Sequence, residues 1–486
     1  MAMPSTGPRE PAALPPAPSR PVLIPLIVAC ALFMENLDST IIATALPSIA
    51  RSMGEDPLHL SLAITAYLLS LAVFIPLSGW MADRYGARRV FMSAIVVFTL
   101  GSALCGQATG MAELVAARIL QGLGGAMMVP VGRIVLLRSV PKEGLVRAMA
   151  FVTVPALIGP VLGPPIGGFI ATYASWRWIF YINVPIGLLG LILVHAVIPD
   201  SRADEPPPLD LRGWALVGLG LASVVFSVEA VGRDVLPAPA IAALALVGAL
   251  LLLLYRRHAR RTARPILDLS LLRIPTYRTA MLGGAVYRIG IGAIPLLLPL
   301  MLQLGFGMDA LESGLLTLAS ALGALAMKTT AGPILRRFGF RSVLVANAVL
   351  SGGLLMGYGL FRPETPQMAV FGLLLAGGFF RSLQFTSINT LGYADIPPER
   401  MGQASGLSST AQQLCLSLGV GLGAMLLQAT VLWRGGGAVE AADFTPAFLL
   451  IGLVAIGSAL VFRRLEADAG QVVSGHRIEE ARQAAE

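Results

Sequence analysis

Two acidic residues lie within the first long apolar segment of the chain, in the run MENLDSTIIATALP. They are Glu35 and Asp38, and a separation of three residues places both carboxylates on one face of a helix. An ionisable side chain is costly to bury in an apolar segment, so it is a candidate for function. Burial favours the neutral form of a carboxylic acid, whereas a nearby arginine favours the charged form. We therefore expect Asp38 or Glu35 to bind and release a proton; the alternative is a polar tie to a neighbouring helix.

The fourth long apolar segment contains one basic residue, Arg118, in the run ARILQGLGGA. Gln121 follows three residues later on the same helical face. With a rise of about 1.5 Å per residue, Asp38 and Arg118 both lie roughly 20 Å from the same edge of a hydrocarbon layer about 30 Å thick. Equal depth permits a contact but does not show that the two residues face each other. We expect Arg118 to belong to a polar pathway, and a tie between packed helices is the alternative.

Apolar segments of membrane length must position these side chains. The chain has 486 residues, of which 56% are hydrophobic and 13% are charged, whereas a soluble domain carries about 25% charged residues. The sequence therefore predicts an all-α polytopic membrane protein. A spanning helix needs about 20 mostly apolar residues, and this criterion gives fourteen spans in a 6+2+6 arrangement. They lie at roughly 22–47, 58–82, 90–108, 111–132, 146–171, 177–198, 212–232, 238–256, 276–303, 311–333, 342–361, 367–391, 402–430 and 444–464.

Positive charge is distributed unequally between the loops. With both termini in the cytoplasm, 26 of the 35 lysine and arginine residues fall in cytoplasmic loops and tails, and five fall in outer loops. Cytoplasmic loops of membrane proteins carry such an excess, so we expect a multi-pass membrane protein with both ends in the cytoplasm. The same distribution explains the net charge of +8 without a nucleic-acid partner. The basic loop at 256–278 is a candidate contact for anionic lipid.

A short charged motif occurs twice in the chain. The run GWMADRYGARRV covers Gly79–Val90, and the run GPILRRFGFR covers Gly332–Arg341. The offset of 253 residues indicates two related six-helix halves, which is an established transporter architecture. Asp83 of the first copy corresponds to Arg336 of the second, so only the first copy carries the acid.

The repeat and the apolar segments together predict five parts of the chain. These are a disordered cytoplasmic tail at 1–21, an N-terminal six-helix bundle at 22–198, a linker with two extra helices and the basic loop at 199–275, a C-terminal six-helix bundle at 276–464 and a cytoplasmic tail at 465–486.

The fifth apolar segment contains a dense run of glycine and proline, ALIGPVLGPPIGGFI. Gly159, Gly163 and Gly167 recur every four residues and form a small-residue face for close helix contact. Prolines remove backbone hydrogen bonds and bend a helix. We expect this helix to form the surface on which the two halves move. The predicted residues are Gly159, Pro160, Gly163, Pro164, Gly167 and Gly168.

The charges within the apolar segments of the second half are basic. Arg288 lies in the ninth segment and Arg381 in the twelfth, where Gln384 and Asn389 follow. We expect these four residues to line a substrate cavity, because buried ionisable and polar groups mark substrate pathways. Lys328 lies near the inner end of the tenth segment, and we expect its amine to extend to the membrane interface.

Signatures of enzymes and of bound cofactors are missing from the sequence. It has no P-loop, HExxH or GxSxG motif, and its four histidines are scattered. Cys30, Cys105 and Cys415 lie in apolar runs without metal-ligand spacing, so no metal site is predicted. Without an ATP site, any pumping must draw on an ion gradient. We expect a secondary active transporter that uses a proton gradient and no cofactor.

These motifs resemble those of the major facilitator superfamily and, within it, of the fourteen-span drug:H+ antiporters and bacterial multidrug resistance exporters. The charged motif matches at Gly79, Asp83, Arg84, Gly86 and Arg88, with Ala87 where a basic residue is common. The other matches are Asp38, Thr40, Ala45, Leu46 and Pro47 in the first span, Arg118, Gln121 and Gly122 in the fourth, and Gly159, Pro160, Gly163, Pro164, Gly167 and Gly168 in the fifth. The stretch WRWIFYINVPIG is also similar.

The resemblance implies the major facilitator fold and proton-coupled export of drugs across the bacterial inner (plasma) membrane by alternating access. It implies that Asp83 and Arg88 stabilise one conformation at an inner gate, and that Arg118 acts with Asp38 in proton coupling. The expected partners are a small-molecule substrate, protons and membrane lipid, and a periplasmic adaptor is left open.

Two alternatives to drug export are export of a specific small anion and a non-transporting role as a membrane sensor or scaffold. Exporters of cationic drugs in this family often carry further carboxylates in their spans, whereas the second half of this chain carries basic residues. Export of a specific small anion, such as an organic acid or a metal chelate, is therefore the runner-up. A non-transporting membrane sensor or scaffold would need a soluble signalling domain, which the two tails of about 20 residues are not expected to form.

Overall fold

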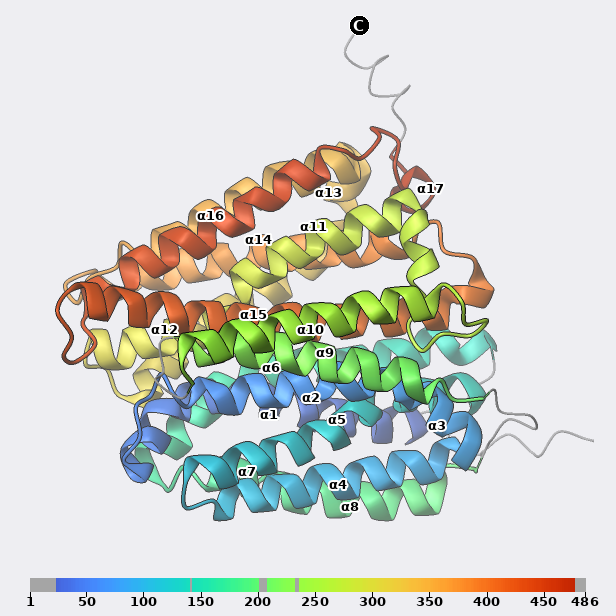
Figure 1. The fold of residues 1–486 in the computed structure, drawn as a ribbon, viewed down its shortest axis with the longest axis horizontal. Coiled ribbons are helices and arrows are strands. Elements are labelled where there is room, and N and C mark those ends of the chain that lie inside the picture. Colours follow the sequence, from blue (N-terminus) through green and yellow to red (C-terminus); the bar gives the residue numbers. More distant parts are fainter. Residues whose placement is uncertain (1–22, 140–141, 201–207, 232–235, 477–486) are drawn as a thin grey trace, which may run out of the picture.

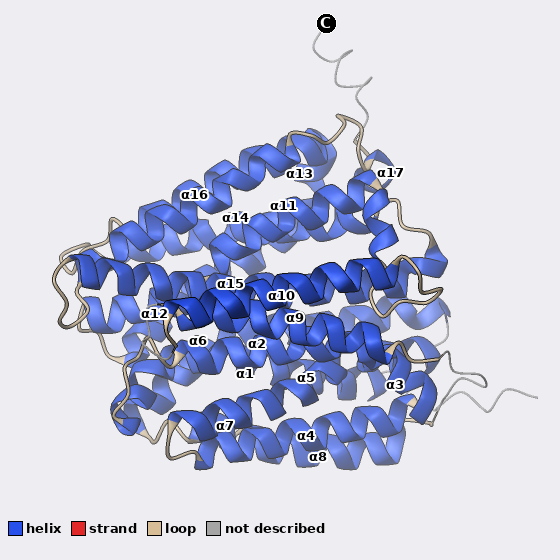
Figure 2. Cartoon of the chain, viewed as in Figure 1, coloured by secondary structure: helices blue, strands red, loops and turns tan. Residues whose placement is uncertain are grey.

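The computed structural model describes residues 23–139, 142–200, 208–231 and 236–476. The described residues form helices and connecting loops, with no strand among them (Figure 2). Twelve helical stretches in this part of the chain are long and apolar enough to cross a membrane. The predicted tail at 1–21 lies outside the described residues, as do parts of the predicted linker and C-terminal tail.

The described residues of the first half form six long helical stretches. Its elements are α1 (Leu23–Met53), α2 (Ser61–Phe74), η1 (Ile75–Leu77), α3 (Ser78–Tyr85), α4 (Ala87–Gln107), α5 (Met111–Ser139), α6 (Lys142–Tyr173), α7 (Trp178–Tyr181) and α8 (Asn183–Val197). The observed ends differ from the predicted ends by less than two helical turns. The predicted segment 58–82 is not one regular helix, because Pro76 in the 3-10 turn η1 lacks the backbone donor that an α-helix needs.

The second half repeats this plan. Its elements are α11 (Pro275–Gly292), α12 (Ile294–Leu300), η3 (Met301–Gly305), α13 (Ala310–Tyr358), α14 (Gln367–Tyr393), η4 (Pro398–Arg400), α15 (Met401–Trp433), η5 (Ala441–Asp443), α16 (Phe444–Phe462) and α17 (Gln471–Ser474). The predicted segment 276–303 divides into α11, α12 and the π-helical η3. The predicted segments 311–333 and 342–361 are joined in α13, whose backbone leaves helical geometry at Gly339.

The two copies of the charged motif turn the chain in the same way. Gly86 follows α3 with φ of 94°, and Gly339 within α13 has φ of 69°. Glycine adopts positive φ readily, whereas other residues pay a steric cost there. In Figure 1, α3 and α17, which packs on α13, lie at the same end of the molecule. The alignment of Gly79–Val90 with Gly332–Arg341 therefore matches a repeated backbone turn.

The two halves meet closely at the end of the molecule opposite these turns. Gly168 of α6 lies against the backbone of Ala310 at the start of α13. Gln303 of η3 donates from Nε2 to the carbonyl of Thr44 in α1 at 2.9 Å. In Figure 1 the helices of the first half lie mainly in the lower part of the molecule and those of the second half mainly in the upper part. At this end the halves are therefore joined by a close glycine contact and by a hydrogen bond from a side chain to the backbone.

Two further helices, α9 (Leu211–Ala230) and α10 (Ala238–Ala259), lie between the halves in sequence. The first of them packs against both α2 and α15, and Trp214 donates its indole N–H to the carbonyl of Val73 at 3.0 Å. Asp210 accepts from the backbone N–H of Gly213 and so caps the start of α9. Its carboxylate also lies 2.7 Å from His258 Nε2 near the end of α10. Helices α9 and α10 are thus bonded to each other, and α9 packs against both halves.

The basic loop after α10 is fastened to the start of α15. Arg400 Nη2 donates to Asp268 Oδ2 at 2.6 Å, and Ser270 lies beside the same carboxylate. Burial alone would raise the pKa of the Asp268 carboxyl, but hydrogen bonds from Ser270 and Arg400 outweigh burial and lower it. The loop therefore has a defined position through the short helix η2 (Leu269–Arg273).

Alanine in place of Gly86 or Gly339 is expected to destabilise the protein by about 1–2 kcal/mol, because a residue with a Cβ is strained at positive φ. At Gly86 the new Cβ would also overlap the carboxylate of Asp200. Gly79 and Gly332, the first glycine of each copy, are matched controls, since a Cβ there meets no atom within 4 Å. Thermal unfolding of the purified protein in detergent measures the difference. Equal melting temperatures for all four alanine variants would contradict the expectation.

Candidate functional site

Asp38 and Arg118 meet in the interior of the first half. Asp38 lies in the middle of α1 and Arg118 in α5, and Arg118 Nη1 is 2.6 Å from Asp38 Oδ2. Gln121 donates from Nε2 to Asp38 Oδ1 at 2.8 Å and accepts from Arg118 Nη1 at 2.6 Å. The exposed fractions are 1% for Asp38 and 0% for Arg118 and Gln121. The structure thus brings together Asp38 and Arg118, which the sequence placed at similar depth, and Gln121, which it placed on the same helical face as Arg118.

A fourth polar residue, Asn183 at the start of α8, completes the bonding of the carboxylate. Its Nδ2 donates to Asp38 Oδ1 at 3.0 Å and to the hydroxyl of Ser102 in α4 at 2.9 Å. Ser102 in turn donates to the carbonyl of Phe180 at 2.9 Å. Helices α1, α4, α5 and α8 are therefore joined through one buried carboxylate.

The guanidinium of Arg118 is held from the other side by α2. Its Nε donates to the carbonyl of Ala63 at 3.2 Å, and its plane lies over the ring of Tyr67, 4.1 Å from the centroid. A cation over an aromatic face is stabilised by the ring quadrupole. Arginine stays charged in proteins, so Asp38 is the member of this group that can accept a proton.

Small residues allow the helices to approach closely enough for these bonds. A Cβ added to Gly101 in α4 would lie 2.6 Å from the backbone nitrogen of Gln121, and one added to Gly122 in α5 would lie 2.6 Å from Ser70 in α2. Close backbone contact of this kind is the usual role of small residues between membrane helices. The position of the polar network therefore depends on Gly122, which belongs to the span-four motif, and on Gly101, which lies outside the motifs.

Glu35 lies apart from this network. It is buried in α1 with an exposed fraction of 9%, and its Oε2 has no hydrogen-bond partner in the described part of the chain. The two carboxylates therefore have different surroundings, although they share a helix. Asp38 is bonded to a cation and two amides, whereas Glu35 is not bonded to Arg118.

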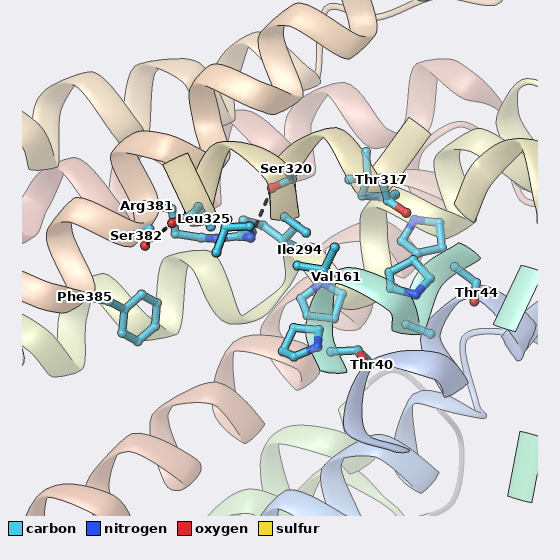
Figure 3. A pocket seen from close by; sticks show the side chains of 18 of the residues that line it. Thr40, Thr44, Val161, Ile294, Thr317, Ser320, Leu325, Arg381, Ser382 and Phe385 are labelled. Atoms are coloured by element: carbon cyan, nitrogen blue, oxygen red, sulfur yellow. Dashed lines mark hydrogen bonds between the residues drawn. The ribbon is translucent and has the colours of Figure 1, made fainter. Parts of the chain in front are cut away.

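A cavity of about 450 Å³ lies between the two halves (Figure 3). The first half contributes α1, with Thr40 and Thr44, and the proline-rich part of α6; the second half contributes α12, α13 and α14. Its charged lining residues are Lys328 and Arg381, and no carboxylate is among the described residues that line it. Arg381 Nη2 donates to the hydroxyl of Ser320 at 3.1 Å. Figure 3 marks this hydrogen bond with a dashed line.

Only Arg381 of the four predicted cavity residues lines this cavity. Arg288 donates from Nη2 to Asn389 at 2.9 Å, in a separate and much smaller space. Gln384 is fully buried and accepts from Nδ2 of Asn347 in α13 at 2.8 Å, so it ties two helices of one half together. Arg381, Gln384 and Asn389 lie within nine residues of one another on α14, but their side chains bond to different neighbours.

Lys328 also differs from its predicted position at the membrane interface. Its Nζ donates to the hydroxyl of Thr386 in α14 at 3.0 Å, and the side chain lines the cavity between the halves. The sequence therefore predicted a membrane-interface position for Lys328, whereas the structure places this lysine on the cavity lining.

The first copy of the charged motif contacts the segment that follows α8. Arg88 Nη1 donates to the carbonyl of Ile198 at 3.4 Å, and Arg89 pairs with Asp200 at 3.3 Å. These bonds join the turn after α3 to the end of the last helix of the same half. Arg89 is largely exposed, so the pair contributes little to stability on its own.

The glycine run of α6 lies between α1 and the other half. Gly159, Gly163 and Gly167 all lie against α1, and Gly168 lies against Ala310 of α13. The helix runs without interruption through its prolines. One helix therefore contacts both the helix that carries Asp38 and a cavity-lining helix of the second half.

Three side chains of the polar network were not among the predicted residues. Asn183 lies in the stretch INVPIG. The available signal was a polar amide residue within an apolar stretch, at the start of a helix. Ser102 and Tyr67 lie within apolar helices, where their type and spacing are ordinary. Their role follows from the packing of α2 and α4 against α5, which no single segment specifies.

The fold and the site together define a class of protein. Two repeated helical halves, a buried ion pair inside one half and a cavity between the halves are the features of a secondary transporter. The chain belongs to the Major Facilitator Superfamily, whose family model matches residues 28–420 and 280–480. It is a membrane transporter rather than an enzyme.

Named relatives and solved structures agree with this family. The chain is 38% identical over 452 residues to a Serratia proteamaculans protein that carries the name multidrug resistance protein MdtD, covering 91% of this chain and 93% of the relative. A protein of the same name from Salmonella heidelberg is 40% identical over 408 residues, covering 82% and 85% of the two chains. The crystal structure of a D-xylose-proton symporter has the same fold, with a TM-score of 0.66, 15% identity and coverage of 92% and 98%.

Asp38→Asn is expected to lower the free energy of unfolding by about 3–5 kcal/mol, because it leaves the Arg118 guanidinium buried without a counter-charge. The double variant Asp38→Asn/Arg118→Gln removes both charges and should recover part of this loss. A double-mutant cycle on unfolding in detergent measures the coupling. Glu113→Gln, an exposed acid at the start of α5, is the control and should change little. Simple additivity of the two single losses would rule out the coupling.

Proposed function

We propose that this chain exports small molecules from a bacterial cell in exchange for protons, and that its substrates are of the multidrug resistance type. The observation that carries the proposal is the buried contact between Asp38 and Arg118, 2.6 Å apart. The names of the relatives support the substrate type. The carboxylate is the group that takes up the proton, and the cavity between the halves is the site that takes the substrate.

Protonation of Asp38 changes which arrangement of helices is favoured. The charged carboxylate holds Arg118, Gln121 and Asn183 together. A neutral carboxylic acid no longer compensates the buried guanidinium, whose desolvation cost then opposes this arrangement. A proton that binds the two conformations with different affinity shifts the equilibrium between them. In the proposed cycle this shift drives the return step after substrate release.

The position of α1 supports coupling between the proton site and the cavity. Asp38 is part of the polar network, while Thr40 and Thr44 of the same helix line the cavity. The glycine face of α6 packs on this helix and continues to α13 of the other half. In the proposed mechanism, Gly159, Pro160, Gly163, Pro164, Gly167 and Gly168 form the surface on which the halves move. The segment with Gly79, Asp83, Arg84, Gly86 and Arg88 acts as a conformational gate.

The proposed topology has fourteen spans arranged 6+2+6, with both termini in the cytoplasm. A helix of 49 residues is about 74 Å long, so α13 exceeds a hydrocarbon core of about 30 Å and its break at Gly339 separates two spans. The helix α6 has 32 residues, enough for one further span. The excess of basic residues on one side supports the orientation. Helices α9 and α10 are the middle pair in the predicted 199–275 region.

Asp38→Asn is expected to slow proton-driven drug efflux by more than about tenfold, because the variant cannot bind or release a proton at this site. Asp38→Glu keeps a titratable group and should retain part of the activity. The measurement is efflux of a fluorescent drug from energised vesicles, together with the associated pH change inside. Glu113→Gln is the matched acid control on α5. Parental rates in both Asp38→Asn and Arg118→Ala would exclude this proton site.

A second candidate function is the export of a specific small anion, such as an organic acid or a metal chelate. It is favoured by the two cationic side chains on the cavity lining, Lys328 and Arg381. Arginine and lysine bind carboxylate and phosphate groups through charge-assisted hydrogen bonds. The positive charges of Lys328 and Arg381 would therefore repel a cationic drug and attract an anionic one.

Lys328→Gln and Arg381→Gln are expected to raise the half-saturating concentration of an anionic substrate by about tenfold each, because each removes one charge-assisted hydrogen bond. Counterflow of labelled organic acids in proteoliposomes measures this, beside efflux of neutral and cationic dyes. Arg288→Gln is the control, because this arginine does not line the cavity. If both variants transport anions at the parental rate and neither transports cations faster, the anion candidate is wrong.

A further inference from the structure

The second copy of the charged motif borders a pocket of about 490 Å³ that the transport mechanism does not use. It lies beside the turn at Gly339, and its first lining residue on α13, Phe338, is ten residues beyond Lys328 of the cavity between the halves. Its polar lining residues are Arg341 and Ser342 after this turn, Arg463 after α16, and His476 after α17. Three separate elements thus direct basic or hydroxyl groups to one place.

The first copy of the motif shows what this pocket lacks. There, the segment after the last helix of the half places Asp200 beside the turn, and its carboxylate pairs with Arg89 at 3.3 Å. In the second half the corresponding segment places His476 beside the turn, where Nδ1 lies 2.8 Å from the carbonyl of Arg336. The same backbone arrangement therefore has a carboxylate in one half and a basic residue in the other.

Among the residues that the structure describes, no carboxylate pairs with the arginines of this pocket. No ion pair joins Arg341 or Arg463 to a carboxylate in the described part of the chain, including Glu466 and Asp468 of the nearby tail. Both arginines are exposed. Asp83 of the first copy corresponds to Arg336 in the second, so the second copy carries no acid. An anion is therefore the complementary ligand.

One wall of the pocket is apolar. Phe338 lines it with an exposed fraction of 53%, and Val345 lies on the same helix two turns later. A basic cluster beside an exposed apolar surface, at the end of membrane helices, matches a molecule with an anionic head and a hydrocarbon tail. A small hydrophilic phosphate would leave the apolar wall without a partner.

We infer that this pocket binds an anionic phospholipid, with its phosphodiester on Arg341 and Arg463 and an acyl chain along Phe338 and Val345. The inference uses the proposed orientation, in which this face lies at the inner leaflet. Arginine forms bidentate hydrogen bonds with phosphate oxygens, and the two guanidinium groups come from different helices. The bound lipid would therefore join α13 to the end of α16, and supply the negative charge that Asp200 supplies in the first half.

The test is binding of phosphatidylglycerol to the purified full-length protein in detergent, measured by native mass spectrometry and titration. Arg341→Gln and Arg463→Gln are each expected to weaken phosphatidylglycerol binding by about fivefold, as expected for one basic residue near an anionic lipid. Arg337→Gln is the matched control, since Arg337 belongs to the same motif but does not line the pocket. Melting temperatures without lipid confirm that the variants are folded.

Three outcomes would overturn the inference. Equal weakening by Arg337→Gln would show a general surface charge effect rather than a pocket. Glycerol phosphate that competes with phosphatidylglycerol at equal concentration would show an anion site without a role for the acyl chain. Equal binding of phosphatidylethanolamine would show that net negative charge is not recognised. None of these measurements requires transport activity, so they remain separate from the test of drug or anion export.

Discussion

The contact between Asp38 and Arg118 is the constraint on which the first half depends. A carboxylate and a guanidinium can be buried together at 2.6 Å, but neither can be buried alone without a cost of several kcal/mol. The pair therefore fixes the positions of α1 and α5, and the hydrogen bonds from Asn183 and to Ala63 extend this constraint to α8 and α2. Gly101 and Gly122 allow α4 and α2 to pack closely on α5 around this pair.

The two halves have the same backbone turn at the charged motif, but they differ in the charge of their side chains. The turns at Gly86 and Gly339 have the same positive φ geometry, which is the part of the repeat that steric rules fix. The side chains around them have diverged: the first copy has Asp83 and the nearby Asp200, and the second has Arg336 and His476. The same division extends to the interior, since the buried carboxylate network lies in the first half and the cationic cavity residues lie in the second.

Much of the fold could be predicted, because apolar length and glycine-containing repeats are properties of single segments. The depth of Asp38 and Arg118 was also predictable, since it depends only on counting along each helix. The direction in which a side chain points depends on the neighbouring helices. For this reason Gln384 was assigned to a cavity although it faces Asn347, and Lys328 was assigned to the interface although it lines the cavity. Asn183 was missed because its partner is 145 residues away in sequence.

The arrangement of α1 limits how protons and substrate can be coupled. Asp38 is bonded inside the first half, and among the described residues that line the cavity, α1 contributes Thr40, Ala43 and Thr44 but not Asp38. Proton and substrate therefore do not compete for one carboxylate in this conformation. Coupling in the proposed mechanism must pass through the helix itself. A shift of α1 that separates Asp38 from Arg118 also displaces the threonines at the cavity and the glycine face of α6. Because α6 touches α13, a change in the charge of one buried group can reach the opposite half.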